Sequence, residues 1–241
     1  MTVKLYLGDC LEIMPTLAEV DAIITDIPYG TTACSWDEVI PFDEMWEQVE
    51  RVTGVFVTTA SQPFTSKLVM SNLDWFKYEW IWNKVRGVGH FNAKIRPMIS
   101  TESICVFGKN GHTYNPQMRE RDKPRKSKNN ATQKVYGKSD KYSGDILNKR
   151  YPVNLITFSK SSQADMVSHP TQKPIALYEY LVKTYTNEGD TVCDITMGSG
   201  TTGVACVQTG RNFIGIEIEP KYYEIAEARI AEAQLQIRME I

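Results

Sequence analysis

Short apolar runs alternate with amphipathic stretches at both ends of the chain. Residues 1–84 predict strand 4–7, helix 11–17, strand 22–25, helix 42–52, strand 54–59, helix 64–73 and strand 77–82. The alternation returns as helix 171–185, strand 191–195, helix 201–208, strand 213–218 and a last helix from about 221. Such alternation predicts an α/β fold with a doubly wound, mostly parallel sheet.

The segment between these two parts has a different pattern. Glycines and polar residues interrupt residues 85–165, and only Ser103–Phe107 has the composition of a strand. We therefore expect one domain built from residues 1–84 and 166–241, and an inserted region at 85–165. Because its polar run has little periodicity, we expect part of the insertion, about 115–150, to be mobile.

Charge is unevenly distributed between these parts. The chain carries 27 Lys/Arg and 29 Asp/Glu, which gives a net charge of −2. Residues 119–150 hold 11 of the basic and 4 of the acidic residues, a net of +7, which leaves 16 basic and 25 acidic residues, a net of −9, elsewhere. This asymmetry favours a segment that binds a polyanion, although a solvated loop has the same composition.

Composition excludes several other classes of protein. Hydrophobic residues make up 42% and charged residues 23%, and no apolar run is long enough to span a membrane. Because the N-terminal residues lack the pattern of an export signal, we expect a cytoplasmic protein. The five cysteines and three histidines are scattered, so we expect reduced thiols and no metal site.

The sequence "TVCDITMGSGTTGVAC" combines an acid with a glycine-rich turn. Asp194 ends a predicted strand, and Gly198, Gly200 and Gly203 follow with G-x-G-x-x-G spacing before a helix. Glu217 ends the next strand, where a carboxylate can accept hydrogen bonds from a ribose. An acid before the loop would repel a pyrophosphate and attract a cation, which favours S-adenosylmethionine over NAD. A glycine turn without a ligand is the alternative.

The sequence "AIITDIPYG" places a second acid at the end of a buried strand. Pro28 restricts Ile27 to an extended conformation, so the Asp26 carboxylate and the Ile27 carbonyl could both accept hydrogen bonds from one exocyclic amino group. These bonds would localise the nitrogen lone pair for methylation, and Tyr29 offers a ring for stacking on a base. The alternative is a Pro-Tyr turn in which Asp26 caps a helix.

The order of three motifs resembles the β group of DNA amino-methyltransferases. "TDIPYG" precedes "HPTQKP", which precedes "DITMGSGTTGVAC", and the resemblance covers residues 1–84 and 166–241. It implies an S-adenosylmethionine-dependent, Rossmann-like methyltransferase fold with circularly permuted motifs, which acts on double-stranded DNA. The family's catalytic motif usually has proline where this chain has Ile27.

The resemblance also implies roles for individual residues. The residues implied in catalysis are those of the Asp-Ile-Pro-Tyr motif: Asp26, Ile27, Pro28 and Tyr29. The residues implied in cofactor binding are Asp9, His169, Thr171, Lys173, Asp194, Gly198, Ser199, Gly200, Thr201 and Glu217. Among these, Asp9 is expected near the cofactor adenine, and the "HPTQKP" residues are expected near its methionine carboxylate.

The basic segment acquires a function under this interpretation. An enzyme that extrudes a base from a duplex needs contacts to the phosphates around it. The residues we expect to bind phosphate are Arg119, Arg121, Arg125, Lys126 and Lys128.

The expected target is the N6 amino group of adenine, because within the family aspartate at position 26 is more often associated with adenine N6 than with cytosine N4. Methylation of cytosine N4 or of RNA, and a catalytically weak DNA-binding protein, are the alternatives. Methylation of cytosine C5 is disfavoured because the chain has no Pro-Cys pair. The sequence leaves open the target sequence, the choice between monomer and homodimer, and a role in restriction, in a phage or in regulation.

Overall fold

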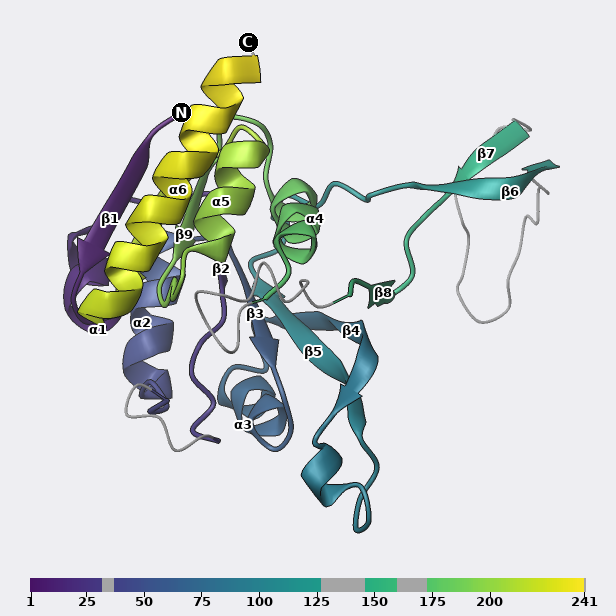
Figure 1. Cartoon of the computed structure of the whole chain (residues 1–241), viewed down its shortest axis with the longest axis horizontal. Coiled ribbons are helices and arrows are strands. Elements are labelled where there is room, and N and C mark those ends of the chain that lie inside the picture. The colour runs from purple at the N-terminus through teal and green to yellow at the C-terminus, as the bar shows by residue number, and fades with distance from the viewer. Residues whose placement is uncertain (32–36, 127–145, 160–172, 241) are drawn as a thin grey trace. The chain divides into compact units, whose positions relative to one another are not determined.

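The computed structural model describes residues 1–31, 37–126, 146–159 and 173–240 (Figure 1). These residues form two compact units. The first unit comprises Met1–Asn115 and Asn154–Ile241, and the second comprises Pro116–Val153.

An eight-stranded sheet with the order β1-β10-β9-β2-β3-β5-β4-β8 forms the first unit. Its parallel half consists of β1 (Val3–Leu7), β10 (Asn212–Glu217), β9 (Thr191–Asp194), β2 (Ala22–Thr25) and β3 (Val55–Ala60). Three further strands follow β3 in the sheet: β5 (Ile99–Gly108), β4 (Phe76–Val88) and β8 (Leu155–Thr157). β5 is antiparallel to its neighbours β3 and β4, and β8 is parallel to β4. The predicted α/β fold with a mostly parallel sheet is confirmed, and strands from both ends of the chain meet in it.

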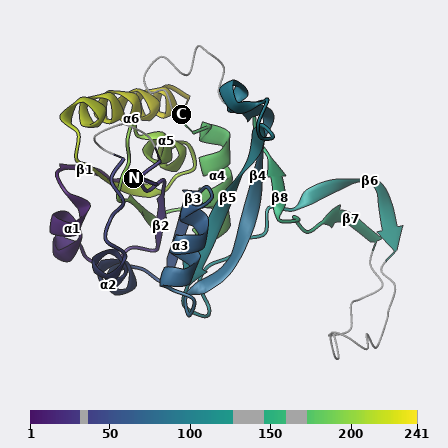
Figure 2. The same ribbon diagram turned by 90° about the horizontal axis from the view of Figure 1, so that it is seen from below.

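Helices cover both faces of the sheet (Figure 2). The helices of the first unit are α1 (Cys10–Ile13), η1 (Met14–Thr16), α2 (Phe42–Val52), α3 (Phe64–Ser71), η2 (His90–Asn92), α4 (Ile175–Tyr185), α5 (Thr201–Gln208) and α6 (Pro220–Glu240). Side chains of β2 alternate between two buried clusters: Ile23 packs with residues of α1, α2 and α3, while Ala22 and Ile24 pack with residues of α4, α5 and α6. Successive strand residues point to opposite faces, so a fully apolar strand serves both layers.

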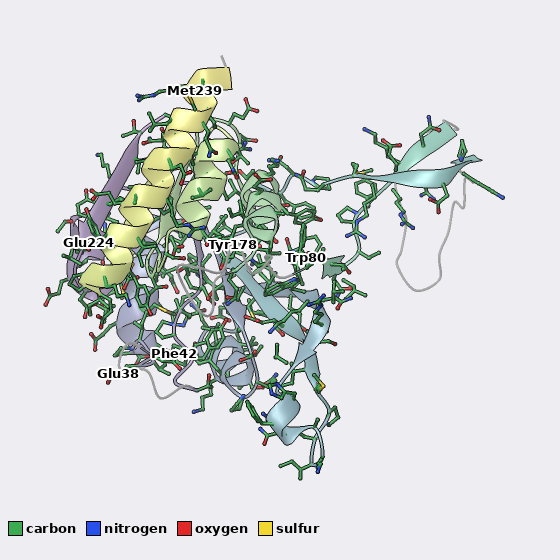
Figure 3. The ribbon with its side chains drawn as sticks, in the orientation of Figure 1. Glu38, Phe42, Trp80, Tyr178, Glu224 and Met239 are labelled. Atoms are coloured by element: carbon green, nitrogen blue, oxygen red, sulfur yellow. The ribbon has the colours of Figure 1, made fainter. Side chains whose placement is uncertain are left out.

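Aromatic side chains fill the space between α4 and the sheet. Trp80 of β4 donates its indole N–H to the hydroxyl of Tyr185, at 2.6 Å, and Tyr178 is buried in the same cluster (Figure 3). Burial of these rings contributes to holding α4 against the strands that carry the site.

The predicted helix at 11–17 is divided into α1 and the 3-10 turn η1. Pro15 has no N–H to donate to the carbonyl of Leu11, so the α-helix ends before the proline. The predicted strand at 77–82 is longer in the structure, because β4 continues to Val88.

The second unit is an antiparallel ribbon of β6 (Arg119–Lys126) and β7 (Ile146–Arg150). Its bounds differ from the expected insertion at 85–165, because β5 belongs to the main sheet and pairs with both β3 and β4. Of the stretch expected to be mobile, residues 127–145 lie outside the described residues. The expected role of this unit in target recognition stays a prediction.

The close packing of α5 against α6 and β10 depends on Gly203. A Cβ atom at this position would lie 2.4 Å from Cδ1 of Ile230 and 2.7 Å from Cε1 of Phe213. We expect Gly203→Ala to lower the free energy of unfolding by about 1–3 kcal/mol in urea denaturation, because Ile230 and Phe213 must shift. Gly54→Ala is the control, since a Cβ there meets nothing within 4 Å. Equal stability of both variants and the wild type would contradict this account.

Candidate active site

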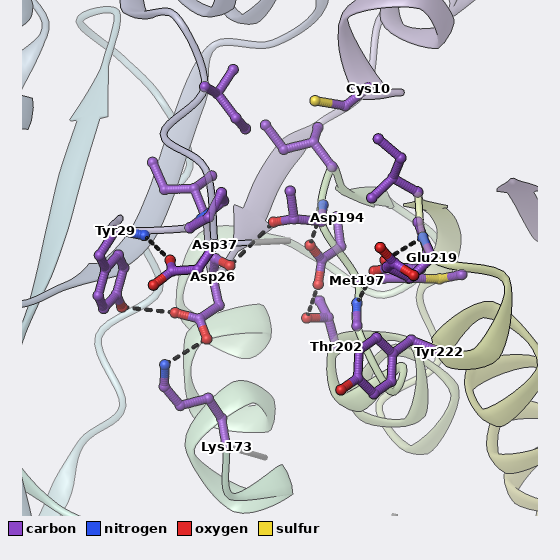
Figure 4. Close-up of a pocket in the computed structure, with 18 of the residues that line it drawn as sticks. Cys10, Asp26, Tyr29, Asp37, Lys173, Asp194, Met197, Thr202, Glu219 and Tyr222 are labelled. Atoms are coloured by element: carbon purple, nitrogen blue, oxygen red, sulfur yellow. Dashed lines mark hydrogen bonds and ion pairs between the residues drawn. The ribbon is translucent and has the colours of Figure 1, made fainter. Parts of the chain in front are cut away.

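A cavity of about 830 Å³ opens at the carboxyl ends of the parallel strands (Figure 4). Its wall includes residues that end or follow β1, β2, β9 and β10, among them Asp9, Asp26, Asp194 and Glu217. Open parallel sheets bind ligands at this edge, because loops from several strands meet there. The cavity therefore joins the catalytic motif and the glycine loop, whose acids Asp26 and Asp194 are 168 positions apart in the sequence.

The glycine loop forms one end of the cavity. Gly198 adopts φ +52° and donates its N–H to Glu217 Oε2 at 2.8 Å, and Glu219 donates its N–H to Glu217 Oε1 at 2.9 Å. Burial raises the pKa of the Glu217 carboxyl, and these backbone donors oppose that rise. A Cβ at position 198 would meet no atom within 4 Å, so the loop backbone is open to a ligand.

Asp194 is a buried acid on the wall of the cavity. Its carboxylate accepts hydrogen bonds from the hydroxyls of Thr25, at 2.7 Å, and Thr202, and from the N–H of Thr196, at 3.2 Å. Burial raises the pKa of Asp194 to about 6, while the hydroxyl donors oppose that rise. At neutral pH the group is therefore mostly an anion, which favours a cationic ligand beside it.

The other described residues expected to bind the cofactor lie close by. Asp9 caps α1 by accepting the N–H of Leu11 at 2.8 Å, and it lines the cavity together with Ser199 and Thr201. Gly200, at φ +78°, is the N-cap of α5. The predicted residues His169 and Thr171 lie outside the described residues.

Asp26 forms the other end of the cavity. Its Oδ1 lies 2.7 Å from the hydroxyl of Tyr29 and accepts a hydrogen bond from the hydroxyl of Thr59. Its Oδ2 pairs with the ammonium of Lys173 at 2.6 Å. The side chain of Asp26 is 31% exposed, so a ligand in the cavity can still reach it.

A second carboxylate extends this group of charges. Glu102 Oε1 lies 3.1 Å from Nζ of Lys173, and Glu102 Oε2 lies 2.6 Å from Nζ of Lys84. Burial alone would raise the pKa of Glu102, but the two lysines lower it to about 2. Burial tends to lower the pKa of Lys173, and the carboxylates of Asp26 and Glu102 more than offset this, so it is raised. We call Asp26, Lys84, Glu102 and Lys173 the buried charge network.

Tyr29 is held on both its backbone and its side chain. Its ring stacks on Phe64, with centroids 5.1 Å apart, and its hydroxyl lies 3.0 Å from Glu102 Oε1. Burial and the neighbouring carboxylates of Asp26 and Glu102 raise its pKa well above the usual value, so the phenol keeps its proton. The buried Asp37 accepts the N–H groups of Tyr29, at 2.8 Å, Gly30 and Thr31, which fixes the turn after the motif.

The remaining two residues of the motif both line the cavity, and one of them also belongs to the core. Ile27 is buried in the cluster that includes α1, α2 and α3, whereas both Ile27 and Pro28 contribute atoms to the cavity wall. The isoleucine side chain therefore replaces the family's usual proline with an apolar group that the core accommodates.

The structure brings Asp26 and Lys173 together. The place near the methionine carboxylate that the resemblance implied for Lys173 stays a prediction. The Lys173 ammonium lies on the catalytic motif, away from the glycine loop (Figure 4). Asp37, Thr59 and Glu102 also contribute to the site, although no motif in the sequence placed them there. The position of Thr59 could have been expected, because it lies near the end of β3, and parallel strands such as β2 and β3 end at the same edge of a sheet.

The expected phosphate-binding residues belong to the second unit. Arg119 and Arg121 lie on β6, and Arg121 donates its Nε–H to the carbonyl of Lys149 at 3.0 Å. Arg125 and Lys126 complete β6, and Lys128 lies outside the described residues. Their role in DNA binding stays a prediction.

The parts of the chain that the structure describes contain neither a membrane-spanning helix nor a metal-binding cluster. None of the described helices is long and apolar enough to cross a membrane. Within the same parts of the chain, no group of three or more His, Cys, Asp or Glu residues could hold a metal ion.

A doubly wound sheet with a glycine loop and acids at its carboxyl edge defines a class of α/β proteins that bind nucleotide-like ligands. A family model described as DNA methylase (N6_N4_Mtase) matches residues 20–228, and the chain belongs to this family of DNA amino-methyltransferases. The predicted family membership is thereby confirmed.

Individual relatives agree with this assignment. The Type II methyltransferase M.HpaI of Haemophilus parainfluenzae is 28% identical over 95% of this chain and 74% of its own length. The Type II methyltransferase M1.MboII of Moraxella bovis is 27% identical over 97% of this chain and 98% of its own length.

Solved structures are similar over nearly the whole chain. The crystal structure of an M1.HpyAVI–SAM complex has a TM-score of 0.64 and 28% identity, covering 95% of this chain and 99% of that one. The PvuII DNA methyltransferase, described as cytosine-N4-specific, has a TM-score of 0.66 at 18% identity, covering 98% and 93%, and shows the same fold.

The buried charge network generates a prediction about stability. We expect Glu102→Gln to lower the free energy of unfolding at pH 7 by on the order of 3 kcal/mol, because two buried lysines lose their shared anion. The pKa of Glu102 is lowered from 4.5 to about 2 in the folded protein. Its stabilisation is therefore present above pH 4.5 and is lost as the pH falls towards 2, so the difference between variant and wild type should shrink over that range.

Urea denaturation at several pH values checks this prediction. Glu179→Gln is the matched control, because Glu179 forms a more exposed pair with Lys183 at 3.7 Å and should cost less than about 0.5 kcal/mol. A pH-independent difference between Glu102→Gln and the wild type would contradict the account.

Proposed function

We propose that this protein transfers the methyl group of S-adenosyl-L-methionine to the N6 amino group of adenine in double-stranded DNA. One observation carries the proposal: a single cavity is lined both by the glycine loop with Asp194 and Glu217 and by the catalytic motif with Asp26 and Tyr29. A methyl donor and an amino group must meet in one site, because an in-line displacement depends on their relative position.

The cofactor of this enzyme is S-adenosyl-L-methionine, which supplies a methyl group on a positively charged sulfur. The residues present fit it. Asp194 offers a buried negative charge to its cationic groups, and each Glu217 oxygen retains acceptor capacity for ribose hydroxyls after accepting one backbone N–H. The open backbone at Gly198 allows close approach, and Asp9 lies at the same wall for the adenine.

Asp26 is the group that we assign to the target amino nitrogen. Its carboxylate and the Ile27 carbonyl accept hydrogen bonds from the two N–H groups. The nitrogen lone pair is then less delocalised into the ring and is available to attack the methyl carbon. As the N–C bond forms and the S–C bond breaks, the nitrogen becomes cationic, and it then loses one proton to the Asp26 carboxylate. Lys173 and Thr59 hold that carboxylate in place from its other sides.

The choice of adenine rests on the acid at position 26 of the chain. Since solved structures of the same fold include a cytosine-N4-specific enzyme, the family itself leaves the base open. In either case the base must leave the duplex to reach a carboxylate inside a cavity. Arg119, Arg121, Arg125, Lys126 and Lys128 are the residues that we assign to the phosphates of the surrounding duplex.

Nucleoside analysis tests the proposal. We expect that labelled methyl groups, transferred from S-adenosylmethionine to unmethylated DNA of mixed sequence, will be recovered after digestion as N6-methyladenine. Recovery as N4-methylcytosine would contradict the assignment of the base. Label in RNA, supplied in a parallel reaction, without label in DNA would contradict the assignment of the substrate.

A further inference from the structure

The turn between β4 and β5 departs from a regular hairpin. Asn83 pairs with Thr101, but the next pair joins Val88 to Ile99. The chain therefore advances five positions along β4 and only two along β5, which is a register shift. Within the irregular part, Val85 has φ +68°, which a β-branched residue rarely adopts. Such bulges re-aim strands and occur often beside functional sites. We call residues 85–99 the hairpin tip.

The hairpin tip exposes large apolar side chains. Phe91 is 89% exposed and Ile95 is 83% exposed, and Val85, Met98 and Ile99 are also exposed. Large apolar side chains that are exposed together in one short turn mark a surface that binds a partner.

The charges of the hairpin tip are all of one sign. Arg86, Lys94 and Arg96 are exposed, and residues 84–101 contain no aspartate or glutamate. None of these three side chains has an ion-pair partner in the parts of the chain that the structure describes. A basic surface that also exposes an aromatic ring is complementary to DNA, which offers phosphates outside and flat apolar bases inside.

The hairpin tip is continuous with the active site. Lys84, one residue before it, belongs to the buried charge network, and both Lys84 and Val88 line the cavity. β4 therefore leads from the cavity wall directly into the exposed turn, and all of these residues belong to the first unit.

We propose that the hairpin tip binds duplex DNA beside the cavity, with Arg86, Lys94 and Arg96 on phosphates and Phe91 inserted in the base stack. Removal of a base from the stack is energetically unfavourable, and an inserted apolar side chain compensates by filling the vacated space. This proposal rests on the proposed function, since the base that leaves the stack is the one that enters the cavity.

The cationic part of the proposal is tested by the salt dependence of DNA binding. Fluorescence anisotropy measures the affinity of the full chain for a labelled duplex at several salt concentrations. We expect the triple variant Arg86→Gln/Lys94→Gln/Arg96→Gln to reduce the slope of log K against log[salt] by about 2.7, or about 0.9 for each lost phosphate contact. An unchanged slope would overturn the proposal. This measurement requires no methyl transfer, so it stands even if the proposed reaction proves wrong.

The role of Phe91 is tested with the target duplex carrying 2-aminopurine in place of the methylated base. We expect Phe91→Ala to reduce the fluorescence rise on binding and to lower kcat/KM on duplex DNA at least about tenfold. The loss should be smaller on a duplex with an abasic site opposite the target, because that base is already loosely stacked. Affinity for S-adenosylmethionine should not change.

Met239→Ala is the matched control, since Met239 is a 78% exposed apolar residue at the end of α6 (Figure 3). If Phe91→Ala gives the same 2-aminopurine fluorescence rise and the same kcat/KM as this control, Phe91 does not insert into the base stack and the proposal is overturned. If Phe91→Ala instead changes the mass of the protein in solution and leaves DNA binding intact, the hairpin tip is a contact between copies of the chain.

Discussion

The ion pair between Lys173 and Asp26 is the contact on which the site depends. It joins residues 147 positions apart, one after β2 and one just before α4. Because Glu102 and Lys84 continue the pairing, two cations and two anions offset one another in a cavity wall that is largely shielded from water. An ionised side chain is costly to bury alone, so loss of one member exposes the others to that cost. The same contacts that stabilise this wall orient the carboxylate that faces the substrate.

The sheet places this network next to the cofactor end of the cavity. β2 and β9 are neighbours, so Asp26 and Asp194 leave the sheet at the same edge. The hydroxyls of Thr25 and Thr196 lie 2.8 Å apart between them; Thr25 donates to Asp194 and Thr196 to the carbonyl of Asp26. Both acids are thus fixed to one rigid element, as a reaction that depends on position requires.

Much of the sheet and half of the site could be predicted from the sequence, for physical reasons. The apolar runs of β2, β3, β9 and β10 are buried on both faces, and an acid or a polar residue marks where each reaches the ligand edge. Glu102 had no such signal, because it lies within the antiparallel strand β5, opposite Trp82, where a polar residue ordinarily faces solvent. Asp37 accepts hydrogen bonds from the backbone N–H groups of the turn that follows the motif, as an acid in any turn could do. The pairing of Lys173 with Asp26 could not be predicted either, because it depends on tertiary packing between residues 147 positions apart.

The most direct measurement compares cofactor binding with methyl transfer in Asp26→Ala. Because Asp26 lies at the substrate end of the cavity, the variant should bind S-adenosylmethionine in calorimetry with an affinity within about threefold of the wild type, while kcat falls by at least about a thousandfold. Asp43→Ala, on the exposed surface of α2, should leave both unchanged. Turnover by Asp26→Ala at the wild-type rate would contradict the assignment of this carboxylate to the target amino group.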